Sequence, residues 1–168
     1  SFAVTAAERG HTVELFDSAS EIGGQFNIAK KVPGKEEFYE TLRYFDRQLK
    51  LKGVKLSLNT RVSAEALKAA GFDEIVLATG VTPRTPDIEG VNHPKVMGYL
   101  DVLRDGKPVG KNVAVIGAGG IGFDVSEFLT HSGTSPSVDA PKFYAEWGID
   151  TSYANVGGLT PPHVEAAP

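Results

Sequence analysis

The sequence lacks cysteine altogether, so none of its 168 residues carries a thiol. Disulfides, thiolate catalysis and cysteine-ligated iron–sulfur clusters are therefore excluded within these residues, and redox chemistry would need a bound cofactor. Methionine is almost as scarce, since Met97 is the only one and the numbering begins at Ser1. We therefore expect the chain to be an internal part of a longer protein.

Long apolar runs and an excess of basic residues are also missing. No run approaches the ~18 residues of a membrane-spanning helix, and the opening residues lack the basic start and cleavage site of a signal peptide. The formal net charge of −4 offers no broad basic surface to a phosphate backbone. We therefore expect a cytoplasmic protein that binds neither membranes nor nucleic acids.

Metal-ligand sets and hydrolytic arrangements are absent too. The four histidines are scattered without the spacing of metal ligands, so we predict no metal site. No Ser/His/Asp order and no pair of carboxylates points to hydrolysis, so we predict no catalytic residue. The hydrophobic content of 41% and the charged content of 23% are ordinary for a globular protein, which leaves the motifs to indicate function.

The spacing of apolar residues predicts an α/β order of elements. The predicted strands cover residues 12–16, 54–58, 74–78 and 113–116. The predicted helices cover residues 2–9, 35–52, 63–70, 99–104 and 142–147, with another directly after the glycines of residues 117–122. Apart from 142–147, the Gly- and Pro-rich stretches 81–94 and 132–168 are expected to be irregular. In the helix from residue 35, the stripe facing the core would be Phe38, Leu42, Phe45 and Leu49.

The clearest motif is the glycine-rich segment Gly117-Ala118-Gly119-Gly120-Ile121-Gly122, directly after an apolar run. In the order strand, GxGxxG and helix, the first glycine permits the tight turn and the second lets the backbone approach a pyrophosphate. The third glycine allows the helix to pack closely on the strand, and the helix N-terminus attracts phosphate. The segment therefore predicts dinucleotide binding; the alternative is a strand–helix turn that binds nothing.

A second, partial signal lies at the beginning of the chain. A helix, Gly10, a strand and then Asp17 follow one another, which is the order found after a dinucleotide fingerprint, where an acid accepts hydrogen bonds from a ribose. The glycines of that fingerprint would precede Ser1. By itself, Asp17 is more typical of a turn at the end of a strand.

Several motifs together resemble one enzyme family. They are Glu21-Ile22-Gly23-Gly24-Gln25-Phe26-Asn27-Ile28-Ala29, Pro33-Gly34-Lys35-Glu36-Glu37-Phe38, Ile75-Val76-Leu77-Ala78-Thr79-Gly80, Gly119-Gly120-Ile121-Gly122-Phe123-Asp124 and Glu146-Trp147-Gly148-Ile149-Asp150. The combination resembles the C-terminal half of bacterial NADPH-dependent 2,4-dienoyl-CoA reductases. Each motif alone is shared with relatives of trimethylamine dehydrogenase and glutamate synthase, so a flavin module of either type remains an alternative.

The resemblance implies a fold of two tandem Rossmann-like units, both incomplete, with parallel sheets flanked by helices. Residues 1–106 would form the FAD-binding part, without its first strand and glycine loop, and residues 107–168 the start of the NAD(P)H-binding domain with an irregular tail. In this family, hydride passes from NADPH to FAD, and electrons cross an iron–sulfur cluster to FMN in a barrel domain, where a dienoyl thioester of fatty-acid oxidation is reduced. The FMN, the cluster and the barrel would lie outside this chain.

The resemblance also implies roles for individual residues. Asp17 would hold the FAD ribose, Gly24 and Gln25 would lie along the FAD, and Val62 would meet the adenine edge. Lys35, a cation at a predicted helix N-terminus, would be a further contact; the alternative is an exposed surface lysine. The segments expected at the flavin side and at the NADPH pyrophosphate are, respectively, Ala78-Thr79-Gly80 and the glycine-rich segment with Gly117, Gly119, Gly120, Ile121 and Gly122.

The chain also departs from the family pattern. The first fingerprint, the barrel and the cluster cysteines are absent, and no apolar run in 132–168 supplies the strand that would select NADPH over NADH. An absent central strand would leave unpaired backbone groups on strands 12–16 and 74–78. Residues 113–116 of this or another copy could fill that gap, as in domain swapping. We expect the chain alone to be inactive and to retain FAD weakly at best. A non-catalytic nucleotide-binding or interaction module remains the alternative.

Overall fold

The computed structural model describes residues 1–163, which form two compact units. The first unit consists of Ser1–Asn27 and Tyr39–Ile88, and the second of Ile28–Phe38 and the chain from Glu89 onward. Each unit is therefore made of two separate stretches of the chain, and no single boundary in the sequence divides them. The boundary between cofactor domains at residues 106 and 107 stays a prediction.

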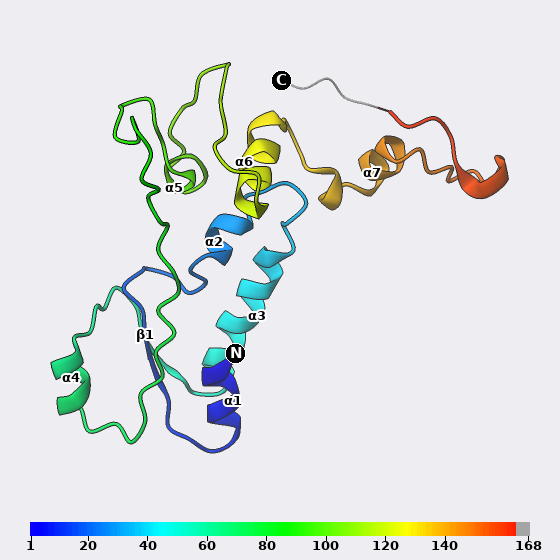
Figure 1. Cartoon of the computed structure of the whole chain (residues 1–168). Coiled ribbons are helices and arrows are strands. Elements are labelled where there is room, and N and C mark those ends of the chain that lie inside the picture. Colours follow the sequence, from blue (N-terminus) through cyan, green and yellow to red (C-terminus); the bar gives the residue numbers. More distant parts are fainter. Residues whose placement is uncertain (164–168) are drawn as a thin grey trace. The chain divides into compact units, whose positions relative to one another are not determined.

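The first unit is built on a small parallel sheet. Strands β1 (Glu14–Phe16) and β2 (Lys55–Ser57) pair with Leu15 opposite Leu56, as the sequence predicts for the strands at 12–16 and 54–58. The helices of this unit are α1 (Phe2–Glu8), α3 (Phe38–Leu51), of which only the first residue falls in the second unit, and α4 (Ala64–Ala69). Figure 1 shows α1 beside the lower half of α3. All three helices were predicted from the sequence.

The core of the first unit lies between these elements. Val4 of α1, Leu49 of α3 and Val54 are buried together, and Phe45 packs against them, so two of the four residues of the predicted stripe, Phe45 and Leu49, face this core. At the end of α3, Gly53 adopts a φ of +67°, which lets the Val54 N–H reach the Leu49 carbonyl at 3.0 Å. This hydrogen bond satisfies a carbonyl that the helix end would otherwise leave free, and it directs the chain into β2.

The second unit is helical in the residues that the structure describes. Its elements are α5 (Tyr99–Leu103), α6 (Gly120–Thr130), α7 (Ala140–Glu146), the 3₁₀ turns η1 (Pro136–Val138) and η2 (Val156–Gly158), and the second half of α2 (Phe26–Ala29). The sequence did not predict α2. Its core is formed by Val32, Leu103 of α5 and Val125 of α6. Phe128 and Leu129 of α6 also pack on this core, whereas Ile121 of the same helix is 53% exposed.

Two strand predictions are wrong. Residues 74–78 and 113–116 are not strands, and Figure 1 draws neither as an arrow. Leu77 and Ile116 are each 79% exposed. An apolar segment becomes a strand only when a neighbouring strand accepts and donates its backbone hydrogen bonds, and no strand pairs with either segment within residues 1–163. Residues 113–116 of the same chain therefore do not fill the gap, and whether those of another copy do stays a prediction.

The tail contains more structure than the sequence predicts. Beyond α7, which agrees with the helix expected at 142–147, an isolated antiparallel bridge joins Ile149 to Leu159 and closes a loop. Residues 164–168, also part of the tail expected to be irregular, lie outside the described residues. None of the helices described has the length and hydropathy that crossing a bilayer requires.

Candidate functional site

The glycine-rich segment forms an open turn at the start of α6. Gly117 has a φ of +118°, a conformation that favours glycine, and Gly119 is the N-cap of the helix. A Cβ on Gly122 would lie 2.1 Å from the carbonyl oxygen of Gly117, so no larger residue fits there without a shift of the backbone. Gly122 therefore packs closely against the backbone of Gly117, whereas the strand on which the sequence predicted it to pack is not formed.

The space around the other glycines of the turn is empty. A Cβ placed on Gly117, Gly119 or Gly120 would meet nothing within 4 Å, and residues 117–121 are all exposed. The first hydrogen bond into α6 runs from the Phe123 N–H to the Gly119 carbonyl at 3.1 Å. The amides that precede Phe123 in the helix lie at its N-terminus, where helical N–H groups have no intrahelical acceptor. The turn therefore offers free donors and room for an anionic group.

Helix α6 is held firmly behind this turn. Its buried Val125 packs with Val32 and Leu103, so the helix is anchored to the core of the second unit along one face. The Ser126 hydroxyl donates to the Gly122 carbonyl at 2.8 Å, within the helix itself. The predicted pyrophosphate-binding turn is thus carried by an element that packing fixes in place.

Lys35, the predicted FAD contact, lies in the same unit as the glycine turn. Its ammonium donates to both carboxylate oxygens of Asp124, at 2.6 and 2.7 Å, and Asp124 stands two residues after Gly122 in α6. The side chains of Lys35 and Asp124 are 40% and 25% exposed, so the pair is partly screened by water. Lys35 is therefore a partly exposed lysine in an ion pair, and its contact with FAD stays a prediction.

The turn that carries Lys35 is fastened on both sides to the segment after α6. The Gly34 N–H donates to the hydroxyl of Ser135 at 3.3 Å, and the Ser137 hydroxyl donates to the Glu36 carboxylate. Burial acts to raise the pKa of Glu36, but the hydrogen bond from Ser137 and others to the carboxylate outweigh it, so that pKa lies below its ordinary value. Glu36 is therefore held as a carboxylate.

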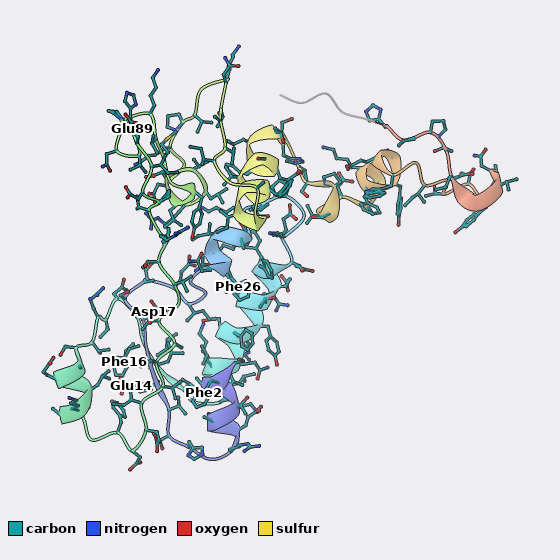
Figure 2. The ribbon with its side chains drawn as sticks, in the orientation of Figure 1. Phe2, Glu14, Phe16, Asp17, Phe26 and Glu89 are labelled. Carbon is teal, nitrogen blue, oxygen red and sulfur yellow. The ribbon has the colours of Figure 1, made fainter. Side chains whose placement is uncertain are left out.

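In the first unit, Asp17 directly follows β1, and Figure 2 shows it beyond Glu14 and Phe16 of this strand. One of its carboxylate oxygens accepts from the Ala19 N–H at 2.9 Å, so Asp17 does form the strand-end turn of the alternative interpretation. A carboxylate has further acceptor sites, so this hydrogen bond leaves capacity for a ribose hydroxyl. The Asp17 carbonyl accepts from the Thr60 N–H at 2.9 Å, which brings the segment leading to Val62 beside Asp17.

Two other predicted segments of the first unit meet at Gln25. The Gln25 side chain donates to the carbonyl of Val81 at 3.3 Å, directly after the predicted segment Ala78-Thr79-Gly80. Gly24 precedes Gln25 with a φ of +49° and open space around it. Gly24 and Gln25 therefore lie next to the chain that directly follows residues 78–80. Asp17 lies next to the chain that leads to Val62. Their roles toward FAD stay predictions.

Sequence reasoning did not find three of the residues that make up this site. They are Asp124, Ser135 and Ser137. Asp124 belongs to a recognised motif, but nothing in the sequence indicates that it meets Lys35, 89 positions away. Ser135 and Ser137 lie in a stretch that was expected to be irregular. Among the residues that the structure describes, no group of three acidic, histidine or cysteine side chains is placed to hold a metal ion.

Residues 1–142 match the family model named pyridine nucleotide-disulphide oxidoreductase. The chain belongs to this family. Family membership implies binding of FAD and a nicotinamide nucleotide. The family name refers to a disulfide, but these residues contain no cysteine and therefore cannot form one. The chain therefore belongs to the family through its nucleotide-binding fold.

The relatives of known activity that the chain matches here are much longer. Cinnamate reductase of Clostridium sporogenes is 37% identical over 134 residues, which cover 79% of this chain and 20% of that protein. Bilirubin reductase of Mediterraneibacter gnavus is 35% identical over 133 residues, covering 79% of this chain and 21% of that protein. This pyridine nucleotide-disulphide oxidoreductase chain thus spans about a fifth of the length of the relatives it matches.

A solved structure of 2-naphthoyl-CoA reductase, in complex with 2-naphthoyl-CoA, is also similar. It aligns with a TM-score of 0.71 and 36% identity over 75% of this chain and 19% of that chain. Together with the family match, it confirms the predicted fold class, α/β with Rossmann-like units and a parallel sheet flanked by helices. The family is that of flavin-dependent pyridine nucleotide oxidoreductases, with relatives named for CoA-ester and enoate substrates.

The residues present fit a dinucleotide at the glycine turn of this family member. The space next to Gly117, Gly119 and Gly120 is open, the turn is exposed, and α6 points its N-terminus at that space. A pyrophosphate needs backbone donors, close approach and a positive helix end, and this turn supplies all three.

Proposed function

We propose that the chain is the nucleotide-binding part of an NADPH-dependent flavoprotein that reduces 2,4-dienoyl-CoA thioesters. The carrying observation is the glycine turn of α6, in which Gly122 is closed against Gly117 while the rest of the turn faces open space. When bound, NADPH supplies a hydride and FAD accepts it. The residues of this chain bind and orient the nucleotides.

In this proposal each unit serves one nucleotide. In the second unit, the residues that take the NADPH pyrophosphate are Gly117, Gly119, Gly120, Ile121 and Gly122. In the first unit, the residues that contact FAD are Asp17, Gly24, Gln25, Val62, Ala78, Thr79 and Gly80. Lys35, which pairs with Asp124 in the second unit, is a further proposed cofactor contact. An FMN and an iron–sulfur cluster belong to other parts of the whole protein.

The substrate class is supported by the names of the relatives. Cinnamate is an unsaturated carboxylate, and 2-naphthoyl-CoA is a CoA thioester of an unsaturated acid. A 2,4-dienoyl-CoA combines both features, a thioester and conjugated carbon–carbon double bonds. The chain itself has no residue that reads the acyl group in this proposal, so the substrate must be tested on the whole protein.

A titration of the full chain with NADPH tests the binding step. Gly119→Val fills the open space of the turn without backbone strain, because Gly119 has a φ of −87°. We expect it to weaken NADPH binding, measured by calorimetry, about tenfold or more. Gly110→Val is the matched control, since Gly110 also has open space around it but lies outside the turn. Equal affinities for both variants and the unchanged chain would contradict nucleotide binding at this turn.

A second measurement on the whole protein tests the reaction. We expect the purified protein to show flavin absorbance and to oxidise NADPH when a 2,4-dienoyl-CoA is added. A purified whole protein without flavin absorbance would contradict the proposal. Binding of NADPH without its oxidation by any enoyl thioester would instead identify a non-catalytic nucleotide-binding module, and oxidation with an amine or glutamate-forming substrate would identify a related flavin module.

A further inference from the structure

A compact hydrogen-bond network surrounds the turn that carries Lys35. Ser135, one of the few buried polar residues, is 7% exposed and accepts at its hydroxyl oxygen from the amides of Gly34 and Ser137, both at 3.3 Å. The hydroxyls of Ser135 and Ser137 are 3.1 Å apart, and the Ser137 hydroxyl meets the Glu36 carboxylate. The residues on either side of Lys35 are thus both bound to the segment 135–137.

The direction of these hydrogen bonds follows from counting hydrogens. Glu36 is held as a carboxylate, so it accepts, and the single hydroxyl hydrogen of Ser137 is used on it. Between the two serines, the hydroxyl of Ser135 must therefore be the donor. Each hydroxyl then uses its only hydrogen and accepts at its oxygen. A polar network in which every member is satisfied fixes its parts in one arrangement.

We infer that Ser135 is a positioning residue that holds the Gly34–Glu36 turn so that Lys35 reaches Asp124 beside the glycine turn. The Lys35 side chain has several rotatable bonds, and an exposed ion pair by itself gains little free energy from fixing them. Anchoring the Gly34 backbone and the Glu36 side chain, on either side of Lys35, fixes the chain that carries Lys35, so its entropy is already lost before the pair forms. The segment 135–137 after α6 thereby acquires a role in the cofactor site.

The inference builds on the proposed function, but its first test does not depend on nucleotide binding. The amine of Lys35 is labelled in the full chain with an acylating reagent, and the rate is followed by mass spectrometry of the digested protein. Because the Asp124 carboxylate must leave the amine before it reacts, we expect Ser135→Ala to raise the rate at Lys35 about threefold or more. Ser135→Thr, which keeps the hydroxyl, should restore the original rate.

Lys107 is the internal control for this labelling. It forms an ion pair with Asp101 at 2.6 Å in the same unit, away from Ser135 in sequence, so its rate should not change. If Lys107 also reacts faster, the Ser135→Ala chain has lost its fold. The labelling rate at Lys35 is then compared in Ser137→Ala, because Ser137 is exposed and its replacement leaves no cavity. An unchanged rate at Lys35 in a folded Ser135→Ala or Ser137→Ala chain overturns the inference.

A double-mutant cycle then links Ser135 to cofactor binding. We expect Ser135→Ala to weaken binding of FAD or NADPH by no more than Lys35→Ala does, and to cause no further loss in the Lys35→Ala background. A further loss of the same size in that background would show that Ser135 acts through general structure, against the inference. If the unchanged chain binds neither FAD nor NADPH, the proposed function fails, while the labelling result still decides the role of Ser135.

Discussion

The carbonyl oxygen of Gly117 lies 2.1 Å from the place that a Cβ on Gly122 would occupy. The turn and the first turn of α6 are thus in backbone contact at this point, and only glycine allows it. Gly120, in the same helical turn, has nothing within 4 Å of its Cβ position. The two glycines therefore make a matched pair, one required by packing and one not.

We predict that Gly122→Ala lowers the free energy of unfolding by about 1–3 kcal/mol, because the added methyl group forces the backbone apart. Gly120→Ala should leave stability unchanged or raise it by up to about 1 kcal/mol, since alanine favours helix. Urea unfolding of the full chain followed by circular dichroism measures both. Equal midpoints for the two variants would show that the close contact does not exist in solution.

Gly23 is the corresponding packed glycine of the first unit. Its φ is +123°, and a Cβ there would lie 2.6 Å from Leu42 Cδ2 and 2.8 Å from Asn27 Nδ2. The side-chain amide of Asn27 donates to the Ile22 carbonyl at 2.9 Å, so a methyl group at position 23 would also displace this hydrogen bond. Gly24, with a φ of +49°, has open space around it.

We predict that Gly23→Ala destabilises the chain more than Gly24→Ala does. Both variants pay for a left-handed backbone, which costs about 1–2 kcal/mol, but only Gly23→Ala adds a steric conflict. The difference is read from urea midpoints of the two variants under the same conditions. A larger loss for Gly24→Ala would contradict the packing around Gly23.

How much of this structure the sequence could predict depends on the range of the interactions. Helices such as α1 and α6 were predictable because their signals, apolar spacing and a terminal glycine, are local. Residues 113–116 look like a strand by composition, but strand formation depends on a distant partner that composition does not reveal. The glycine turn was predictable for the same local reason as the helices. The contacts of Lys35 with Asp124 and of Gly34 with Ser135 span 89 and 101 positions, and no spacing rule reaches that far.

The core of the first unit offers a matched pair of leucines in one helix. Leu49 is 5% exposed, whereas Leu51 is 58% exposed, and both belong to α3. We predict that Leu49→Ala lowers the free energy of unfolding by about 2–5 kcal/mol, because it removes buried methyl groups and leaves a cavity. Leu51→Ala should change it by about 0.5 kcal/mol or less. Thermal or urea unfolding distinguishes them, and similar losses for both would mean that α3 does not pack through the predicted stripe.

The loop closed by the Ile149–Leu159 bridge contains a carboxylate with four hydrogen-bond donors. Asp150 accepts from the amide and hydroxyl of Ser152, and from the backbone and side-chain amides of Asn155. The hydroxyl of Ser152 has the largest effect, followed by the two backbone amides, and together the donors hold the pKa of Asp150 well below its ordinary value of 3.8. Each donor favours the ionised form.

We predict that this loop loosens only in acid. A carboxyl whose pKa is lower in the folded state contributes stability above its ordinary pKa of 3.8 and loses that contribution as the pH falls through the folded value. Hydrogen exchange should therefore show protected Ser152 and Asn155 amides at about pH 5 to 7, with protection falling below the ordinary pKa once intrinsic rates are allowed for. Asp150→Asn, which cannot accept at its amide nitrogen, should lose that protection at every pH, while Asp73→Asn in the first unit should not. Protection that persists in Asp150→Asn would show that the bridge between Ile149 and Leu159, not the carboxylate, holds the loop.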